Sequence, residues 1–366
     1  LDGTDNITRN QSGKLADHFA TVLYTGDAVA IGSGGNPITG VGFQPDYVWL
    51  KSRTSVRGPV MYDAVRGATK RLLTHVTHAE ATTAEGLTSF DSDGFTVGSS
   101  AEENESGKNF VAWCIKAAST ASGATTGAGT AKTYTTQYNP DLGFAIVKYT
   151  GNLTAGHTIP LPAMTDPKAP FMIIYKDLPT TLNWYVWHQD LTPDYALKLQ
   201  TTNAQFAASP VWDNASNVYT APTSASFTVG GNANTNTNDA AHIAYVFWET
   251  DFCKPVTYAG NASTDGSFLN LGGAPAWIMA KRRDGATDWW MTDNVMNPTN
   301  PTQYWIKSNA SEAQQTGVNP YSDFVSNGYK HRATHSTANG SGSNYIGIAF
   351  VSPEPDSKDG AQLRAR

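Results

Sequence analysis

The sequence Phe19-Ala-Thr-Val-Leu-Tyr-Thr-Gly-Asp27 returns as Phe144-Ala-Ile-Val-Lys-Tyr-Thr-Gly-Asn152, and a weaker copy reads Val256-Thr-Tyr-Ala-Gly-Asn261. Each copy is followed by a proline and, six residues later, by a lysine, with apolar residues between them. These pairs are Pro45 and Lys51, Pro170 and Lys176, and Pro275 and Lys281. Because several elements recur three times in one order, the chain is expected to hold three copies of one unit. Successive prolines lie 125 and 105 residues apart, which fits whole domains rather than the short repeats of a solenoid.

The pattern inside each unit is that of β-structure. Short runs rich in Val, Ile, Thr, Tyr, Phe and Trp alternate with Gly, Pro, Asn and Asp. Ser92-Asp93-Gly94-Phe95 and Ser326-Asn327-Gly328-Tyr329 carry the Asp-Gly and Asn-Gly pairs typical of tight hairpins. The sequence therefore predicts an all-β protein of three tandem antiparallel β-sandwich units, jelly-roll or lectin-like in type.

Composition suggests where the units end. Residues 118–136 consist almost wholly of Ala, Ser, Thr, Gly and Lys, and such a segment buries little apolar surface, so we expect a flexible linker. The predicted division is an N-terminal arm (1–18), unit 1 (19–118), the linker (119–140), unit 2 (141–252), unit 3 (253–352) and a C-terminal tail (353–366).

Charge excludes several classes of partner. Only 15% of the 366 residues are charged and the net charge is −6, whereas nucleic-acid binding needs clustered Lys and Arg. No run of 18 apolar residues occurs, so membrane insertion is not expected either.

Motifs that carry chemistry are absent from the sequence. There is no nucleophile elbow, phosphate-binding loop, dinucleotide fingerprint or zinc-protease motif, so we expect no catalytic residue, no metal and no cofactor. A glycan hydrolase would need two neighbouring carboxyl groups. Asp63, Asp190 and Asp293 occur once per unit at similar spacing, which predicts that a domain width separates them.

Aromatic residues are the best candidates for a binding site. In Trp184-Tyr185-Val-Trp187 and in Trp289-Trp290, neighbouring side chains of a strand point to opposite faces, so one of them must leave its own core. Tyr304 and Trp305 could extend such a platform. Exposed rings would stack on sugars or on a protein partner. The alternative interpretation is that they pack between neighbouring units or subunits.

Four ordered motifs of the first unit resemble a known module. They are Gly42-Phe-Gln-Pro-Asp-Tyr-Val-Trp-Leu-Lys-Ser-Arg53, Tyr62-Asp-Ala-Val-Arg-Gly-Ala-Thr-Lys70, Gly86-Leu-Thr-Ser-Phe-Asp-Ser-Asp-Gly-Phe-Thr-Val-Gly98 and Phe110-Val-Ala-Trp-Cys-Ile-Lys-Ala117. The module is found in tail-fibre-like and other virion structural proteins of tailed bacteriophages, and the resemblance covers residues 19–118.

The resemblance implies a component of the virion surface, in a tail fibre, a spike or a head decoration, and it implies no catalytic role for any residue. Its expected partners are other virion proteins and a host-surface polysaccharide, in a homo-oligomer for which a trimer is favoured. Two alternatives stay open, a virion-associated polysaccharide depolymerase and a secreted carbohydrate-binding protein.

Overall fold

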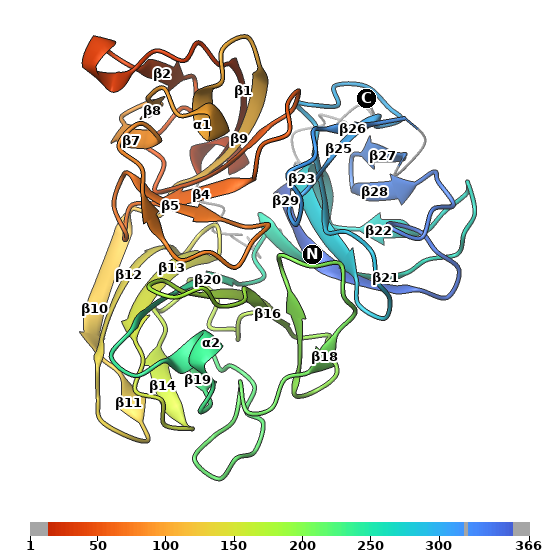
Figure 1. Cartoon of the computed structure of the whole chain (residues 1–366). Helices are drawn as coiled ribbons and strands as arrows, with labels where there is room; N and C mark the ends of the chain where they lie inside the picture. The colour runs from red at the N-terminus through yellow and green to blue at the C-terminus, as the bar shows by residue number, and fades with distance from the viewer. Residues whose placement is uncertain (1–13, 318–320, 354–366) are drawn as a thin grey trace, which may run out of the picture.

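The computed structural model describes residues 14–317 and 321–353, and the chain in these ranges is all-β, as predicted (Figure 1). Most of the predicted N-terminal arm and C-terminal tail lies outside the described residues, and the six-part division of the chain stays a prediction.

The first sandwich pairs a six-stranded sheet with a three-stranded one. The larger sheet has the order β1 (Phe19–Thr25), β9 (Asn109–Ile115), β3 (Tyr47–Ser52), β4 (Val60–Asp63), β5 (Lys70–Leu73) and β6 (Ala81–Thr82). The smaller sheet has the order β2 (Asn36–Thr39), β8 (Gly94–Val97) and β7 (Leu87–Asp91). Short helical turns are η1 (Leu15–Asp17), η2 (Ile31–Ser33) and α1 (Ala101–Asn104).

The second sandwich repeats this arrangement with two extra strands. Its larger sheet has the order β10 (Ser119–Ala124), β12 (Thr133–Asn139), β13 (Phe144–Thr150), β20 (Ala241–Phe247), β15 (Met172–Asp177), β16 (Tyr185–His188), β17 (Tyr195–Lys198) and β18 (Phe206–Ala207). Its smaller sheet has the order β11 (Thr126–Gly127), β14 (His157–Pro160) and β19 (Ser226–Val229), and the helix α2 spans Ala233–Asn236.

The third sandwich returns to the six-plus-three pattern. Its larger sheet has the order β21 (Cys253–Ala259), β29 (Asn344–Pro353), β23 (Gly273–Arg282), β24 (Trp290–Asp293), β25 (Tyr304–Lys307) and β26 (Gln315–Thr316). Its smaller sheet has the order β22 (Phe268–Asn270), β28 (Gly328–His331) and β27 (Ser322–Val325). The larger sheets of the three sandwiches therefore share one topology apart from the two added strands. The smaller sheet of the second sandwich differs, because β11 pairs beside β14 and, among the described residues, no strand takes the place that β7 and β27 have in the other two.

Strand register aligns the three sandwiches residue by residue. Lys51 pairs with Val111, Lys176 with Ile243 and Lys281 with Ile346. The three prolines stand two residues before positions that also correspond: Tyr47 pairs with Asp63, Met172 with His188 and Trp277 with Asp293. Pro45, Pro170 and Pro275 are thus equivalent, as their spacing predicts.

The hydrophobic core consists of one cluster shared by all three sandwiches and of three further clusters, each within a single sandwich. One face of each larger sheet contributes to a common apolar cluster, here called the axial core, which includes Trp49, Trp113, Phe144, Ile174 and Met279. The opposite face of each larger sheet packs on its own smaller sheet in a separate cluster. The three lobes therefore surround one apolar centre (Figure 1).

Burial on both faces explains the sequence of the central strands. Every residue of β3 and of β15 is buried, including the alternate residues that would face water in a single sandwich. A strand covered on both faces has a continuous apolar run rather than an alternating one. This is the origin of the runs that follow each repeated proline.

The prediction of a flexible linker is wrong. β10 pairs with β12 over six residues, and β12 pairs with β13, so this hairpin extends the larger sheet of the second sandwich. Composition misled because β10 buries almost nothing, while Tyr134 and Tyr138 of β12 pack on the core cluster of that sandwich. Thr125, between the strands, is buried, and its hydroxyl oxygen lies 2.7 Å from Nε2 of buried His157.

Candidate functional site

The predicted aromatic platform is not exposed. Trp184, Trp289 and Trp290 are completely buried, and the most exposed of the indoles, Trp305, is 8% exposed. Tyr185 and Trp187 are also buried, and Tyr304 is partly buried against the axial core. Both rings of each pair are therefore covered within the chain, because both faces of each larger sheet are buried.

Two of these rings join neighbouring sandwiches through equivalent hydrogen bonds. Trp184 Nε1 donates to the carbonyl oxygen of Leu73 in β5 (3.0 Å), and Trp289 Nε1 donates to that of Lys198 in β17 (3.1 Å). Leu73 and Lys198 occupy the same register position in their sheets. The structure thus uses these tryptophans for packing between units, the alternative that the sequence left open.

The remaining candidates lie inside their own sandwiches. Trp187 Nε1 donates to the hydroxyl of Tyr219 (3.1 Å), and Trp290 stacks on Tyr329 with ring centroids 6.0 Å apart. These rings fill the space between the larger and smaller sheets. A ligand could not stack on them without opening a sandwich.

Acidic side chains also contribute to the junctions. In the first sandwich, buried Asp63 pairs with Arg66 (2.5 Å), and the hydroxyl of Tyr245 from the second sandwich donates to the same carboxylate (2.8 Å). Burial disfavours the charge on Arg66, but the nearby Asp63, Tyr245 and Glu80 raise its pKa overall.

The third sandwich has Asp293 at the position that corresponds to Asp63, and Trp113 Nε1 of the first sandwich donates to its carboxylate (3.0 Å). Burial raises the pKa of Asp293 to about 6.

The equivalence of Asp190 with these two residues was predicted wrongly. The strand pairing places His188 at that position, two residues earlier, with its Nε2 atom 3.2 Å from the carbonyl oxygen of Gly347 in the third sandwich. Asp190 lies beyond the strand, and its carboxylate accepts a hydrogen bond from Thr257. The spacing between an apolar residue and an aspartate could not distinguish the two positions because Asp190 stands so close to the true one.

Three buried lysines end the repeated motif and contact carbonyl groups rather than carboxylates. Lys51 Nζ lies 3.2 Å from the carbonyl oxygen of Ser311 in the third sandwich, and Lys176 Nζ lies 3.3 Å from that of Thr77 in the first. Lys281 Nζ bonds the carbonyl oxygens of Arg282 and Gly285 within its own sandwich. Burial lowers the pKa of Lys51 and of Lys176 to about 8 and that of Lys281 to about 7.

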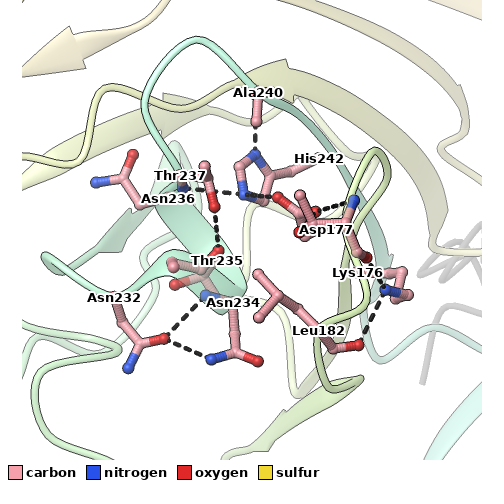
Figure 2. Close-up of polar contacts among 12 residues, drawn as sticks. Lys176, Asp177, Leu182, Asn232, Asn234, Thr235, Asn236, Thr237, Ala240 and His242 are labelled. Carbon is pink, nitrogen blue, oxygen red and sulfur yellow. Dashed lines mark hydrogen bonds and ion pairs between the residues drawn. The ribbon is translucent and has the colours of Figure 1, made fainter. Parts of the chain in front are cut away.

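The second sandwich adds a buried carboxylate–histidine pair next to its lysine (Figure 2). His242 Nε2 lies 3.2 Å from Asp177 Oδ2, and His242 Nδ1 lies 3.1 Å from the carbonyl oxygen of Ala240. Burial raises the pKa of Asp177, but the adjacent imidazole of His242 and the hydrogen bonds that Thr180 donates outweigh this and leave the pKa below its usual range. Tyr149 stacks on the imidazole, with ring centroids 5.1 Å apart.

This pair is closed to solvent and is not coupled to a nucleophile among the described residues. Asp177 and His242 are fully buried. In a hydrolytic triad the second ring nitrogen faces a hydroxyl or thiol, whereas here it faces a carbonyl oxygen. The main-chain N–H of Thr237, just after α2, donates to His242 Nε2. The cluster therefore fastens the end of α2 to strands β15 and β20 (Figure 2).

A second structural element recurs three times and was missed by the sequence analysis. The hydroxyl groups of Tyr24, Tyr149 and Tyr258 donate to the main-chain carbonyl groups of Glu103, Thr235 and Ala338. The buried asparagines that follow these carbonyls are Asn104, Asn236 and Asn339. Their side-chain oxygens accept the main-chain N–H of Asp27, Asn152 and Asn261, the last residues of the repeated Tyr-x-Gly-Asp/Asn motif.

The glycine of that motif is required by close packing. A Cβ on Gly26, Gly151 or Gly260 would lie 2.3 Å from the carbonyl oxygen of residue 105, 237 or 340, well inside contact distance. The repetition of the Tyr-x-Gly-Asp/Asn motif therefore indicated this set of tyrosine and asparagine hydrogen bonds. Its asparagines could not be located from sequence, since the residues around them differ in each unit.

Sites for metals or membranes are not indicated in the described part of the chain. No group of three or more His, Cys, Asp or Glu side chains within it is placed to hold a metal ion. Among its helices, none has the length and apolar character needed to cross a bilayer.

Fold and junctions together define an all-β repeat protein, in which three two-layer sandwiches share one apolar core. The chain belongs to the family described as "Domain of unknown function (DUF7483)", whose model matches residues 14–354. No curated protein matches the chain. A solved structure described as "Crystal Structure of the STIV MCP" is 11% identical, with 67% of this chain and all of that chain covered. Its TM-score of 0.22 is too low to support an argument.

Proposed function

We propose that this chain is a non-enzymatic structural protein of the virion surface of a tailed bacteriophage, in a fibre, a spike or a head decoration. It makes assembly contacts with other virion proteins and attaches to host-surface glycan. The sequence support is the run of four ordered motifs between residues 42 and 117 that resembles modules of such proteins.

The shared axial core is the observation that carries the structural role. The three sandwiches bury their aromatic residues against one another, and buried hydrogen bonds such as Trp113 to Asp293 and Trp184 to Leu73 lock the junctions. Because protein interiors are close-packed, we expect a chain joined in this way to move as one body. Rigidity of this kind suits a protein that transmits position and load within a particle.

The proposal of a non-enzymatic role is supported by the fate of the reactive groups. The histidine–carboxylate pair and the three repeated lysines are all buried and hydrogen-bonded to the protein itself. General acid–base catalysis needs a group within reach of a substrate. These groups serve the fold instead.

Location in the particle is the decisive test. Antibodies raised against the recombinant chain should label purified phage particles in immunogold electron microscopy, and mass spectrometry of those particles should recover its peptides. If the chain is found only in the cleared lysate and never in the particles, the virion role is wrong. Light scattering of the purified chain tests the proposed homo-oligomer, for which we expect a trimer.

A further inference from the structure

A polar groove lies on the sheet extension formed by β10 and β12, which among the described residues belongs to the second sandwich alone. Its volume is about 220 Å³, and it lies over β12, β13 and the start of β20. The lining residues are Thr133, Tyr134, Thr135, Lys148, Tyr149, Thr150 and Ala241. The groove depends on the hairpin, because β13 would otherwise be an edge strand like β1 and β21.

Strand register places hydroxyl groups and one ammonium group on a single face of this groove. Thr135 pairs with Lys148, and Tyr134 pairs with Tyr149, so Thr133 and Thr150 follow on the same face as Lys148. Ser122 of β10, which pairs with Thr135, continues this face to the sheet edge. These side chains are exposed or half-buried, in contrast to the apolar residues that the same face carries in the axial core.

Lys148 is the unmatched charge in the groove. None of the lining residues is acidic, and no described carboxylate forms an ion pair with Lys148. Lys132, which precedes β12, pairs with Asp239 and not with a residue that lines the groove. The corresponding positions in the other two sandwiches are Leu23 and Thr257, so this cation occurs once in the chain.

A second hollow in the molecule differs in this respect. It has a volume of about 180 Å³ and is lined by Asp141, Asp166, Lys168, Glu249, Asp251 and Lys254, among others. Lys168 pairs with Asp166 at 2.9 Å, and Lys254 lies 3.9 Å from Glu249. Both lysines of this hollow pair with carboxylates of the protein itself, so they do not need an anionic ligand.

We propose that the groove of the second sandwich binds an acidic polysaccharide of the host surface, through one uronic-acid ring at a time. Lys148 would pair with the sugar carboxylate, and the hydroxyls of Thr133, Thr135 and Thr150 would exchange hydrogen bonds with sugar hydroxyls. Threonine suits this role because one hydroxyl both donates and accepts. This inference rests on the proposed function and replaces the buried aromatic platform as its glycan site.

Binding of defined sugars to the full recombinant chain tests the inference. Calorimetry should detect an oligogalacturonate pentamer and not the neutral maltopentaose, with affinity that falls as salt is raised. Lys148→Gln should weaken binding at least about tenfold, and Thr135→Val about threefold. Lys108→Gln, which removes one partly exposed lysine of the first sandwich, is the matched control and should bind as the unchanged chain does.

Three results would overturn the inference. They are no binding of the pentamer, unchanged binding by both groove variants whose thermal melts match the unchanged chain, or equal binding of inorganic polyphosphate, which would indicate unselective anion attraction. Particle labelling stays an independent result. If the chain is found in virions but does not bind the pentamer, the structural role stands and the glycan site in the groove is wrong. If the chain binds the pentamer but is absent from virions, the glycan site stands and the virion role is wrong.

Discussion

The axial core and the hairpin extension lie on the same face of one sheet, yet the first is buried and apolar and the second is exposed and polar. β13 and β20 contribute Ile146 and Ile243 to the axial core. On the same face, Lys148 stands two residues further along β13, and Thr135 of β12 and Ser122 of β10 continue the face towards the sheet edge. One end of this sheet face is thus covered by other sandwiches, and its other end leaves polar side chains free to form hydrogen bonds. The comparison teaches that the neighbour of a sheet face, rather than the sheet itself, decides what that face can do.

The largest effect should come from breaking the buried ion pair at the axial junction. Asp63→Asn leaves the charge of Arg66 buried without its main partner, and we expect a loss of about 3–5 kcal/mol in the free energy of unfolding. Asp190→Asn is the control, because that side chain is 38% exposed and should cost less than about 1 kcal/mol. Urea denaturation measures both, and equal losses would show that the Asp63 pair does not stabilise the junction.

A smaller effect is expected from one junction indole. Trp289→Phe removes the indole donor to the Lys198 carbonyl, which keeps only the longer hydrogen bond from the Thr201 N–H (3.4 Å), so we expect a loss of about 0.5–1.5 kcal/mol beyond the packing change. Trp305→Phe makes a similar volume change at an indole whose N–H has no partner among the described residues. If the two variants melt alike, the hydrogen bond between sandwiches contributes nothing to stability.

The pH dependence of the free energy of unfolding should report the three buried lysines. A lysine with a lowered pKa binds fewer protons in the folded than in the unfolded chain, so stability should rise with pH from about 7 towards 10. One fully effective lysine contributes at most about 1.4 kcal/mol per pH unit. Lys281→Met should flatten the rise measured by urea denaturation between pH 7.5 and 9.5, above the range in which Asp293 titrates. Trp305→Phe, which removes no titratable group, is the control and should leave the slope unchanged, and an equal slope in both variants would contradict the role of Lys281.

The smallest effect should come from the edge of the extension. Ser122 is exposed on β10, and Ser122→Lys should change the free energy of unfolding by no more than about 0.5 kcal/mol. The same change at buried Ser52 provides the contrast and should destabilise the chain strongly, since it buries a charge. If both substitutions leave the free energy of unfolding unchanged, the exposed edge at Ser122 and the buried strand at Ser52 do not differ in burial as described.

The sequence was sufficient for the fold class and for the repeat, because residues such as Lys51, Lys176 and Lys281 keep one register position in all three sheets. It was insufficient for the site. Alternation shows that Trp184 and Tyr185 face opposite sides, but it cannot show that another sandwich covers one of those sides. Composition likewise underestimated residues 119–139, because a strand can be held by main-chain hydrogen bonds while its own side chains bury nothing.

Covalent fusion of the three sandwiches has a consequence for stoichiometry. Three separate identical subunits would have to find one another and could be parted by dilution, whereas here each sandwich meets its neighbours at an effective concentration set by the chain itself. Fusion also frees each copy to diverge, and among the described residues the hairpin occurs in the second copy alone. The chain therefore carries one groove for every three sandwiches, so the number of grooves in any assembly of the protein follows the number of its chains.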